Sequence, residues 1–396
     1  MWWSEGILIL LVAILLVHGE EGEDEKEEPT PPPPPPPPPL KPLPDLAKDY
    51  GYDAEKFEIN SNGYTLHLYH IKGKTPGGPV VLMQHGVMAS SDCWSIRNNS
   101  LAYVLADEGK DVWLSNVRGT VYGRKHEKFN PDTDEEFWKF NIHAYAFEDL
   151  PAHIDFVMEK TKATQIYYIG HSMGTTMFLQ LMSSKPEYNA KIKKAVLLAP
   201  VYYCHKFQFM LSKGTSMYQM AVDTMKGFDE KKIWEAFPRS DVPKTEHQMN
   251  CSNIPDMAVS YCKMGMDMTK QYVGEFLPAG TSIYILKHFM QIYTEGVVKP
   301  YDFGVEENMK VYKNETPPNY DIKNIKTEVH TIFCESDQVV DPADAEALMK
   351  DLPNPGTSTY IKNEQFSHID FLLPTSPEVE EDFAKLQDKI KEILKN

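Results

Sequence analysis

Apolar segments alternate with amphipathic segments along most of this chain, and this alternation limits the possible folds more than any other feature of the sequence. The apolar, strand-like segments are 80–84, 111–117, 165–169, 195–199 and 329–335. The helix-like segments are 101–108, 147–160 and stretches that begin at Met173, Pro342 and Pro377. Strands that are apolar throughout and alternate with helices are typical of a parallel sheet covered by helices on both faces. The sequence therefore predicts an α/β fold with a mostly parallel sheet.

The sequence also predicts strands outside this alternation. Residues 56–60 and 64–71 are strand-like and are separated by Ser61-Asn62-Gly63. An Asn-Gly pair between two such segments is a strong signal for a β-hairpin. A further short strand is expected near 360–363.

The alternation stops after Pro200 and returns only at residue 329. Residues 203–300 contain many Met and aromatic side chains, mixed helical segments and few strand signals. An insertion at this position is expected to cover the carboxyl ends of the strands, where ligands of open α/β sheets bind. We therefore divide the folded chain into a first core segment, 46–202, a mainly helical cap, 203–300, and a second core segment, 301–396.

The N-terminal part differs from the rest of the chain. Residues 7–17 form an uncharged apolar run, which predicts a secretory signal peptide over residues 1–19. A transmembrane anchor is the alternative, but a spanning helix needs about 20 apolar residues and this run has about half of them. Residues 20–45 follow as a linker, with an acidic run at 20–28 and prolines at 31–39 that favour a stiff polyproline II rod.

The charge of the chain argues against one class of partner. The formal net charge is −17, and the acidic run at 20–28 contributes only part of it. A chain that is acidic even without that run is not expected to bind nucleic acid, whose phosphates attract basic surfaces.

The segment QIYYIGHSMGTTMF, residues 165–178, places Ser172 between Gly170 and Gly174 where a strand is followed by a helix. In this G-x-S-x-G spacing the chain turns sharply and presents the serine hydroxyl at the edge of the sheet. Glycine is needed on both sides because a Cβ there would clash as the strand and the helix approach each other. We interpret Ser172 as a catalytic nucleophile.

A serine nucleophile needs a base that accepts its proton and an acid that orients the base. In this architecture the three residues follow in the order nucleophile, acid, histidine. Asp337 follows the strand 329–335 and His368 follows the next strand, so the predicted triad is Ser172, Asp337 and His368. Asp341 is the competing acid, but it directly precedes a proline and is typical of a helix N-cap.

Backbone N–H groups are expected to stabilise the oxyanion that forms during acyl transfer. The stretch QHGVMAS, after the strand 80–84, has the position of one donor, which we assign to Val87. Met173 supplies the second donor at the start of its helix. Nearby, we expect His171 to pack beneath the site and Asp370 to point away from the catalytic histidine.

Cysteines and glycosylation sequons agree with passage through a secretory pathway. Cys251 and Cys262 are close in sequence, and we expect them to form a disulfide in an oxidising compartment. Cys334 lies in an apolar run and is expected to be a buried thiol. The N-x-[ST] sequons are at Asn98, Asn250 and Asn314.

From about residue 50 to the last helix, the chain resembles the acid lipases, the group that contains gastric lipase and lysosomal acid lipase. The stretches that carry the resemblance, besides the serine motif, are YGYDAEKFEINSNGYTL, VVLMQHGVMASSDCW, NNSLAYVLADEGKDVWLSNVRG, EFWKF, DLPAHIDF, SDQVVDPADA and FSHIDFL. The resemblance implies an α/β-hydrolase fold whose cap carries a lid. The triad and oxyanion-hole residues that it implies are Ser172, Asp337, His368, Val87 and Met173.

We therefore expect a secreted or lysosomal serine lipase that hydrolyses triacylglycerols or sterol esters through an acyl-enzyme, without a metal or organic cofactor. Its expected partner is a lipid ester at an oil–water or micelle interface. Six apolar side chains of the cap favour a lipid surface: Phe207, Phe209, Met210, Leu211, Met217 and Met220. Two alternatives stay open, a short-chain carboxylesterase on the same fold and a catalytically silent lipid-binding or storage protein.

Overall fold

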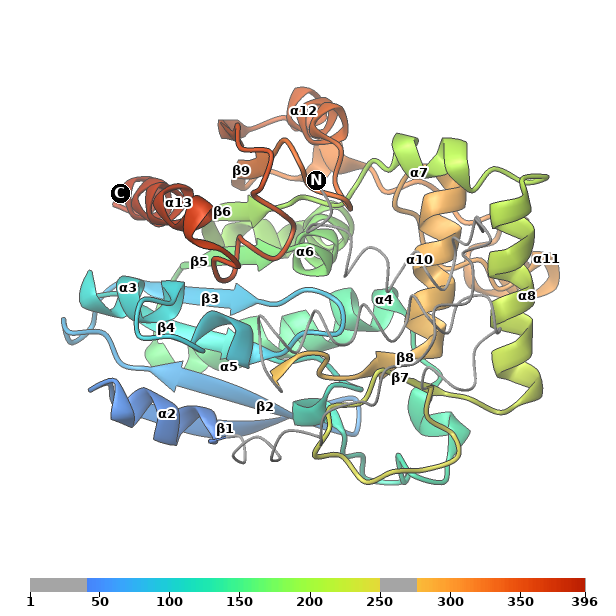
Figure 1. Ribbon diagram of the computed structural model, residues 1–396, viewed down its shortest axis with the longest axis horizontal. Helices are drawn as coiled ribbons and strands as arrows, with labels where there is room; N and C mark the ends of the chain where they lie inside the picture. The colour runs from blue at the N-terminus through green and yellow to red at the C-terminus, as the bar shows by residue number, and fades with distance from the viewer. Residues whose placement is uncertain (1–40, 250–275, 396) are drawn as a thin grey trace, which may run out of the picture.

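The computed structural model describes residues 41–249 and 276–395 (Figure 1). The expected signal peptide, the acidic run with its prolines, Asn250 and the pair Cys251 and Cys262 lie outside the described residues. These predictions therefore stay predictions.

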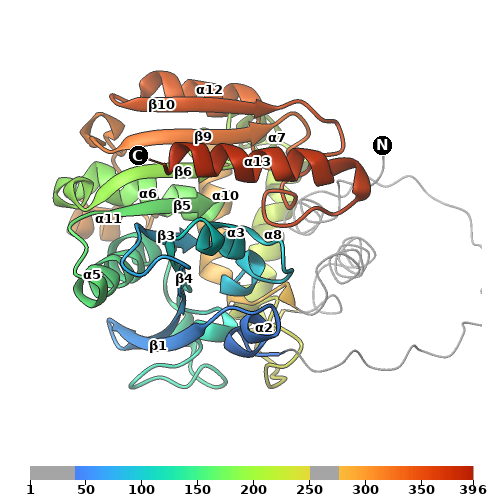
Figure 2. The same cartoon turned by 90° about the vertical axis from the view of Figure 1, so that its left-hand side faces the viewer.

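The centre of the molecule is an eight-stranded sheet with the strand order β1-β2-β4-β3-β5-β6-β9-β10 (Figures 1 and 2). Its strands are β1 Ala54–Ser61, β2 Tyr64–Ile71, β3 Val80–Gln84, β4 Asp111–Ser115, β5 Ile166–His171, β6 Ile192–Leu198, β9 Glu328–Cys334 and β10 Pro355–Ile361. The neighbours β1–β2 and β2–β4 are antiparallel, and the other neighbours in this sheet are parallel. The predicted mostly parallel sheet is confirmed.

The hairpin at one edge of the sheet lies where the sequence predicts it. β1 pairs with β2 over the whole length of both strands. At the turn Asn62 has φ 50° and Gly63 has φ 88°. Positive φ at both central residues is the reason that Asn-Gly is favoured in such turns.

The strand at the opposite edge differs from the prediction. Strand β10 begins at Pro355, five residues before the expected segment near 360–363, and ends within that segment. It is an edge strand with one neighbour, and most of its side chains are polar or partly exposed. Because the strand is not buried on both faces, its sequence lacks the apolar run by which the other parallel strands were recognised.

Helices cover both faces of the sheet (Figures 1 and 2). Helices α3 Leu101–Asp107 and α13 Glu380–Ile393 contact each other on one face, and α5 Leu150–Thr161 and α6 Met173–Ser184 lie on the other. Helix α12 Pro342–Asp351 packs beside β9 and β10. This arrangement buries the apolar strands from both sides.

Shorter helical elements complete the core. Helix α2 Leu43–Asp49 begins within the segment 20–45 that was assigned to the linker, and its Leu43 and Ala47 are buried. Helix α4 Ile142–Ala144 and the π-helical turn Tyr145–Asp149 lead into α5. Among the described residues, the 3₁₀ segments are Ser91–Trp94, Val121–Gly123, Glu135–Trp138, Pro186–Ala190, Ile322–Asn324 and Pro377–Val379.

The described part of the insertion 203–300 is mainly helical and stands beyond the arrowhead of β3 in Figure 1. It contains α7 His205–Met210, α8 Ser216–Glu230 and α10 Ile283–Glu295, with a short antiparallel ladder between β7 Glu235–Ala236 and β8 Thr281–Ser282. Helix α10 contacts both α7 and α8, and α11 Val305–Val311 follows the insertion.

The buried apolar side chains of the described residues form two clusters. The large one runs through both core segments and includes side chains of α7 and α10. The small one joins the cap to the loop after β3, through Met88, Met225, Phe228, Ile233, Ala236, Phe237, Met249, Ile283 and Leu286. The cap therefore packs directly on the loop where one oxyanion donor is expected.

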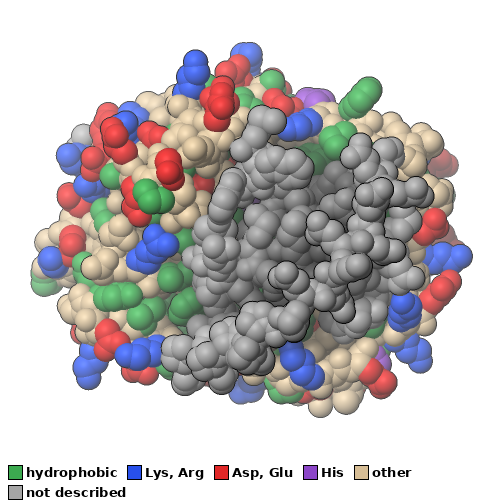
Figure 3. Space-filling model, in the orientation of Figure 1, with side chains coloured by type: hydrophobic (Ala, Val, Ile, Leu, Met, Phe, Trp, Pro, Cys, Tyr) green, Lys and Arg blue, Asp and Glu red, His purple; other side chains and the backbone are tan. Residues whose placement is uncertain are grey.

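Charges of both signs are interspersed over the described surface of the face drawn in Figure 3. A basic stripe of the kind that binds nucleic acid is not formed by the described residues on this face.

Candidate active site

Ser172 lies at the junction of β5 and α6, where the backbone turns sharply. Its φ of 51° and ψ of −117° are values that residues other than glycine rarely adopt. The surrounding structure fixes this conformation. The N–H of Ser172 donates to the carbonyl of Leu198 at 3.0 Å, and the carbonyl of Ser172 accepts from the hydroxyl of Thr175 at 2.6 Å. The strand–turn–helix geometry that the G-x-S-x-G spacing predicts is therefore present.

Glycines allow the backbone segments around Ser172 to approach closely. A Cβ on Gly170 would lie 2.9 Å from backbone atoms of Gly174, and a Cβ on Gly174 would lie 2.6 Å from the carbonyl oxygen of Gln84. A Cβ on Gly86 would lie 3.1 Å from the Cβ of Ser172. The loop after β3 thus lies against the serine itself.

His368 and Asp337 form a buried pair. The Nδ1 of His368 lies 2.8 Å from Oδ2 and 2.9 Å from Oδ1 of Asp337. A carboxylate only accepts, so this Nδ1 carries the hydrogen and the Nε2 of His368 is left as the acceptor. The N–H groups of Val339 and Val340 donate to Asp337 Oδ1 at 2.7 and 3.0 Å, which holds the carboxylate in place.

The two competing aspartates have structural roles. The side chain of Asp341 accepts from the N–H of Ala343 at 2.9 Å and caps α12, as the sequence predicts. Asp370 is turned away from the imidazole of His368 and accepts hydrogen bonds from Ser367 and Thr375. Asp337 is therefore the carboxylate that contacts His368.

His171 packs beneath the site, as expected, and in addition contacts the backbone of His368. Its Nε2 lies 3.0 Å from the carbonyl oxygen of His368, and the two imidazole rings are 4.7 Å apart. Burial and the neighbouring His368 hold the pKa of His171 well below its usual value. His171 is therefore neutral, and its Nε2–H donates to the chain segment that carries His368.

The two expected oxyanion donors lie beside Ser172. Val87 lines the same pocket as Ser172, and Met173 is the first residue of α6. Neither N–H has an acceptor among the residues that the structure describes. Two backbone donors next to a serine are the arrangement that stabilises a developing oxyanion.

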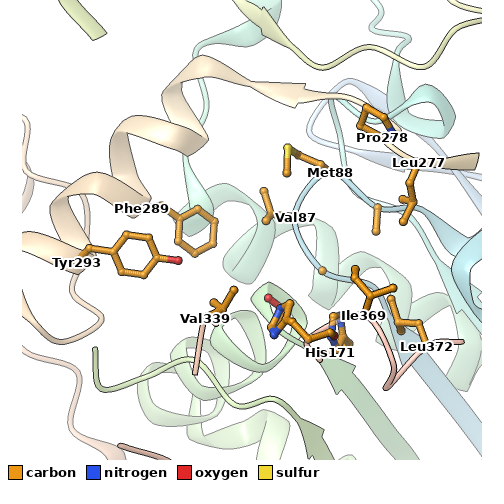
Figure 4. A pocket seen from close by; sticks show the side chains of 14 residues that line it. Val87, Met88, His171, Leu277, Pro278, Phe289, Tyr293, Val339, Ile369 and Leu372 are labelled. Carbon is orange, nitrogen blue, oxygen red and sulfur yellow. The ribbon is translucent and has the colours of Figure 1, made fainter. Parts of the chain in front are cut away.

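An apolar pocket opens above Ser172 (Figure 4). The space between its lining residues amounts to about 660 Å³, a volume that includes open solvent at the mouth of the pocket. Its lining comes from the loop after β3, the serine turn, the cap and the loops that carry Asp337 and His368. The lining residues include Gly86, Val87, Met88, Ala89, Leu277, Pro278, Phe289, Tyr293, Val339, Ile369 and Leu372. Such a pocket accepts apolar groups at the nucleophile.

The cap residues that line this pocket are not those that the sequence singled out. Phe207 and Leu211 are buried in the large core, and Phe207 packs on Tyr293 at 4.5 Å between ring centres. Phe209 is 85% exposed, and the other three are partly exposed. The wall is formed instead by Leu277, Pro278, Phe289 and Tyr293. Phe289 and Tyr293 are four residues apart on the apolar face of α10, which is the signal that could have found them.

Among the described residues, two buried ion pairs link the cap to the core. Arg239 of the cap lies 3.0 Å from Asp92, which also accepts from Ser90 and Tyr122. Glu235 of the cap binds Arg124 through both carboxylate oxygens at 2.9 Å. Burial raises the pKa of Asp92, and Arg239 opposes that shift.

Cys334 is a buried thiol, as expected, whereas glycosylation of the sequons stays a prediction. Cys93, Cys204 and Cys334 are buried free thiols, and burial raises the pKa of each. Asn98 and Asn314 are exposed, so both are accessible to glycosylation.

Comparisons with known proteins agree with this architecture. A family model described as "alpha/beta hydrolase fold" matches residues 79–375, and one described as "partial alpha/beta-hydrolase lipase region" matches 43–98. Human lipase member K is 34% identical over 82% of this chain and 84% of that protein. Mouse gastric triacylglycerol lipase is 34% identical over 82% of this chain and 85% of that protein.

One solved structure shows the likeness in fold. It is a soluble variant of monoglyceride lipase from Saccharomyces cerevisiae in complex with a substrate analog. Its TM-score is 0.51 at 15% identity, and the match covers 86% of this chain and 94% of that chain.

Proposed function

This chain belongs to the lipase group of the alpha/beta-hydrolase family and is a hydrolase, and from its site we propose that it cleaves carboxylic esters of neutral lipids at Ser172. The expected substrates are triacylglycerols or sterol esters. The observation that carries this proposal is the pocket above Ser172, whose walls are apolar on almost every side. The transfer of a long acyl chain from water to such walls lowers the free energy of the complex substantially, whereas the transfer of a small soluble ester lowers it little.

The proposed first half of the reaction forms an acyl-enzyme. The Nε2 of His368 accepts the proton of the Ser172 hydroxyl while the serine oxygen attacks the ester carbonyl carbon. The carbonyl oxygen becomes an oxyanion and accepts from the N–H groups of Val87 and Met173. As the intermediate collapses, the C–O bond to the alcohol breaks and His368 gives its proton to the departing oxygen.

The second half releases the fatty acid. A water molecule gives a proton to His368 and attacks the acyl carbon, and the serine oxygen leaves with that proton. Asp337 accepts the Nδ1–H of His368 at 2.8 Å throughout and stabilises the imidazolium each time it forms. The scheme uses no metal ion and no organic cofactor.

We also propose that the protein acts in the secretory pathway, either outside the cell or in the lysosome. The apolar run at 7–17 and the exposed sequon residues Asn98 and Asn314 support this location. Among the described helices, none has the length and apolar character that crossing a bilayer requires.

A substrate panel tests the proposed function. The full chain is assayed at pH 5 and pH 7 on emulsified trioleoylglycerol, emulsified cholesteryl oleate and a water-soluble butyrate ester below and above its solubility limit. We expect long-chain emulsified esters to be hydrolysed fastest. The rate should rise in a step where an interface forms, because the covered apolar site opens to its substrate at that interface. In parallel, a serine-reactive phosphonate should label Ser172.

Two other outcomes contradict the proposal. Fastest turnover of monomeric butyrate without a step at the interface identifies a short-chain carboxylesterase. Absence of both hydrolysis and labelling identifies a silent lipid-binding protein.

A further inference from the structure

The pocket above Ser172 has two chemically different sides (Figure 4). Phe289, Tyr293 and Val339 lie on one side of Val87 and form what we call the aromatic side. The other side, which we call the aliphatic side, is formed by Leu277, Pro278, Ile369 and Leu372. An ester held at Ser172 also has two parts, the acyl chain and the alcohol, so each part meets a different wall.

Tyr293 brings a hydroxyl into this otherwise apolar wall. Its side chain is buried, and Figure 4 shows the oxygen turned toward the pocket. No described residue accepts from or donates to this hydroxyl. Burial, with small contributions from Cys204 and Asp337, raises the pKa of Tyr293, so the hydroxyl keeps its hydrogen at every pH at which the enzyme is expected to act. It is therefore a neutral donor that has no acceptor among the described residues, placed at the pocket above Ser172.

We propose that Tyr293 is a specificity-determining residue that donates a hydrogen bond to the alcohol part of the substrate and so favours glyceryl esters over esters of alcohols that have no further oxygen. This inference rests on the proposed function. The remaining ester groups of a glyceride carry carbonyl oxygens that accept hydrogen bonds, whereas a sterol or a simple alkanol has no oxygen besides the one in the cleaved bond.

The acyl chain then lies on the aliphatic side. A fatty acyl chain has no polar atom beyond its carbonyl, so it matches Leu277, Ile369 and Leu372 and would leave the hydroxyl of Tyr293 unpaired if it occupied the aromatic side. A buried hydroxyl without a partner is unfavourable relative to one that is bonded. Glycerides bound with their alcohol part toward Tyr293 avoid this cost.

The experiment compares Tyr293→Phe with the wild type on two esters of one fatty acid, trioleoylglycerol and octyl oleate, in the same mixed micelles. The acyl group is identical, so any difference comes from the alcohol. We expect kcat/KM for trioleoylglycerol to fall about fivefold to tenfold, the size of one neutral hydrogen bond, and kcat/KM for octyl oleate to stay within about twofold. Cholesteryl oleate should behave like octyl oleate.

Tyr202→Phe is the matched control. It removes a buried hydroxyl that donates to the carbonyl of Tyr320 at 3.2 Å, outside the pocket. It should leave the ratio of the two kcat/KM values unchanged. Thermal unfolding of Tyr293→Phe should match that of the wild type, because the hydroxyl makes no hydrogen bond to the described part of the protein.

Equal losses on both esters, no loss on either, or a larger loss on octyl oleate each overturn the role of Tyr293. These results leave the proposed function intact, because the wild type still hydrolyses oleate esters in the same assay. If the wild type hydrolyses neither ester and Ser172 does not react with a phosphonate, both the proposed function and the role of Tyr293 are contradicted.

Discussion

The sheet core and the cap both line the pocket above Ser172, but they contribute different kinds of residue. The core supplies Ser172, Asp337 and His368 from loops at the carboxyl ends of strands, where the backbone is fixed by the sheet and by glycines. The cap supplies Phe289 and Tyr293 from one face of α10. We therefore expect substitutions in the core triad to change reactivity and substitutions in α10 to change substrate selectivity.

The two regions are also stabilised differently. The core has one continuous apolar cluster that includes fully buried Trp94, Trp113 and Trp138. The described part of the cap adds a small cluster and two buried ion pairs to the core, Arg239 with Asp92 and Arg124 with Glu235. Helices α7 and α10 of the cap also contribute side chains to the large cluster, so the cap is attached by apolar contacts as well as by these two ion pairs.

Removing the nucleophile should have the largest effect. We expect Ser172→Ala to fold normally and to lose ester hydrolysis by about 10³-fold to 10⁶-fold, as for triad residues in other hydrolases. The measurement is turnover of an emulsified long-chain ester, with circular dichroism to confirm folding. Turnover near the wild-type rate would falsify the assignment of Ser172.

The two aspartates of the segment 337–341 should differ sharply. Asp337→Asn should lower kcat by about 10⁴-fold because the amide cannot stabilise the imidazolium of His368 in the same way. Asp341→Asn is the matched control, since asparagine caps a helix about as well as aspartate and should leave kcat and stability nearly unchanged. The opposite ranking of the two kcat values would show that the wrong aspartate was chosen.

Removal of one ion pair between cap and core should destabilise the protein and leave the predicted triad residues unaltered. Arg239→Met leaves Asp92 buried without its cation, and we expect the free energy of unfolding to fall by about 3–5 kcal/mol. Denaturant unfolding at pH 7.5 measures this loss. The double variant Arg239→Met/Asp92→Asn should recover part of it, and a double variant no more stable than the single one would argue against a buried, charged Asp92.

Lowering the pH should destabilise the cap, because His288 on α10 becomes protonated. Its Nε2 donates to the carbonyl of Lys299 at 2.9 Å, and its Nδ1 accepts from the N–H of Ile142 at 3.3 Å. Burial lowers the pKa of His288 from 6.5 to about 4. The pKa of His288 is lower in the folded state than in the unfolded state. Its contribution to the free energy of unfolding is therefore fully present above about pH 6.5 and is lost as the pH falls toward 4.

The corresponding test compares the wild type with His288→Gln, whose side chain does not titrate. Between pH 7 and pH 4.5, the variant should lose about 2–3 kcal/mol less of its free energy of unfolding than the wild type. Hydrogen exchange of α10 locates the effect in the cap. Identical pH dependence of the two proteins would show that His288 is not buried in its neutral form.

Two phenylalanines of α7 should give the smallest and most selective effect. Phe209 is 85% exposed and Phe207 is 3% exposed. Phe209→Ser should leave the free energy of unfolding unchanged. It should lower the rate of hydrolysis on emulsions a few-fold and change the rate on soluble esters little, because only contact with a lipid surface is lost. Phe207→Ala should instead lower the free energy of unfolding by about 3–5 kcal/mol. If Phe209→Ser lowered the rate on emulsions and the rate on soluble esters equally, Phe209 would not act by contacting the lipid surface.

Much of the core could be predicted because its signals are local. The apolar runs of β3, β5 and β9, the Asn-Gly turn and the spacing around Ser172 each reflect backbone geometry over a few residues. The edge strand β10 was misplaced because a strand with one neighbour needs no apolar run. Helix α2 was missed because its short sequence follows the proline segment.

By itself the sequence determined the parallel sheet, the order of its strands along the chain and the positions of Ser172, Asp337 and His368, since residues at the ends of parallel strands meet at one edge of the sheet. Only the tertiary structure decided which cap residues line the pocket. Phe207 and Phe209 are two residues apart in sequence, yet one is buried and the other faces water, while Tyr293 turns its hydroxyl inward. Apolar side chains of a helical cap have several possible partners, and which one each contacts depends on how helices distant in sequence pack together.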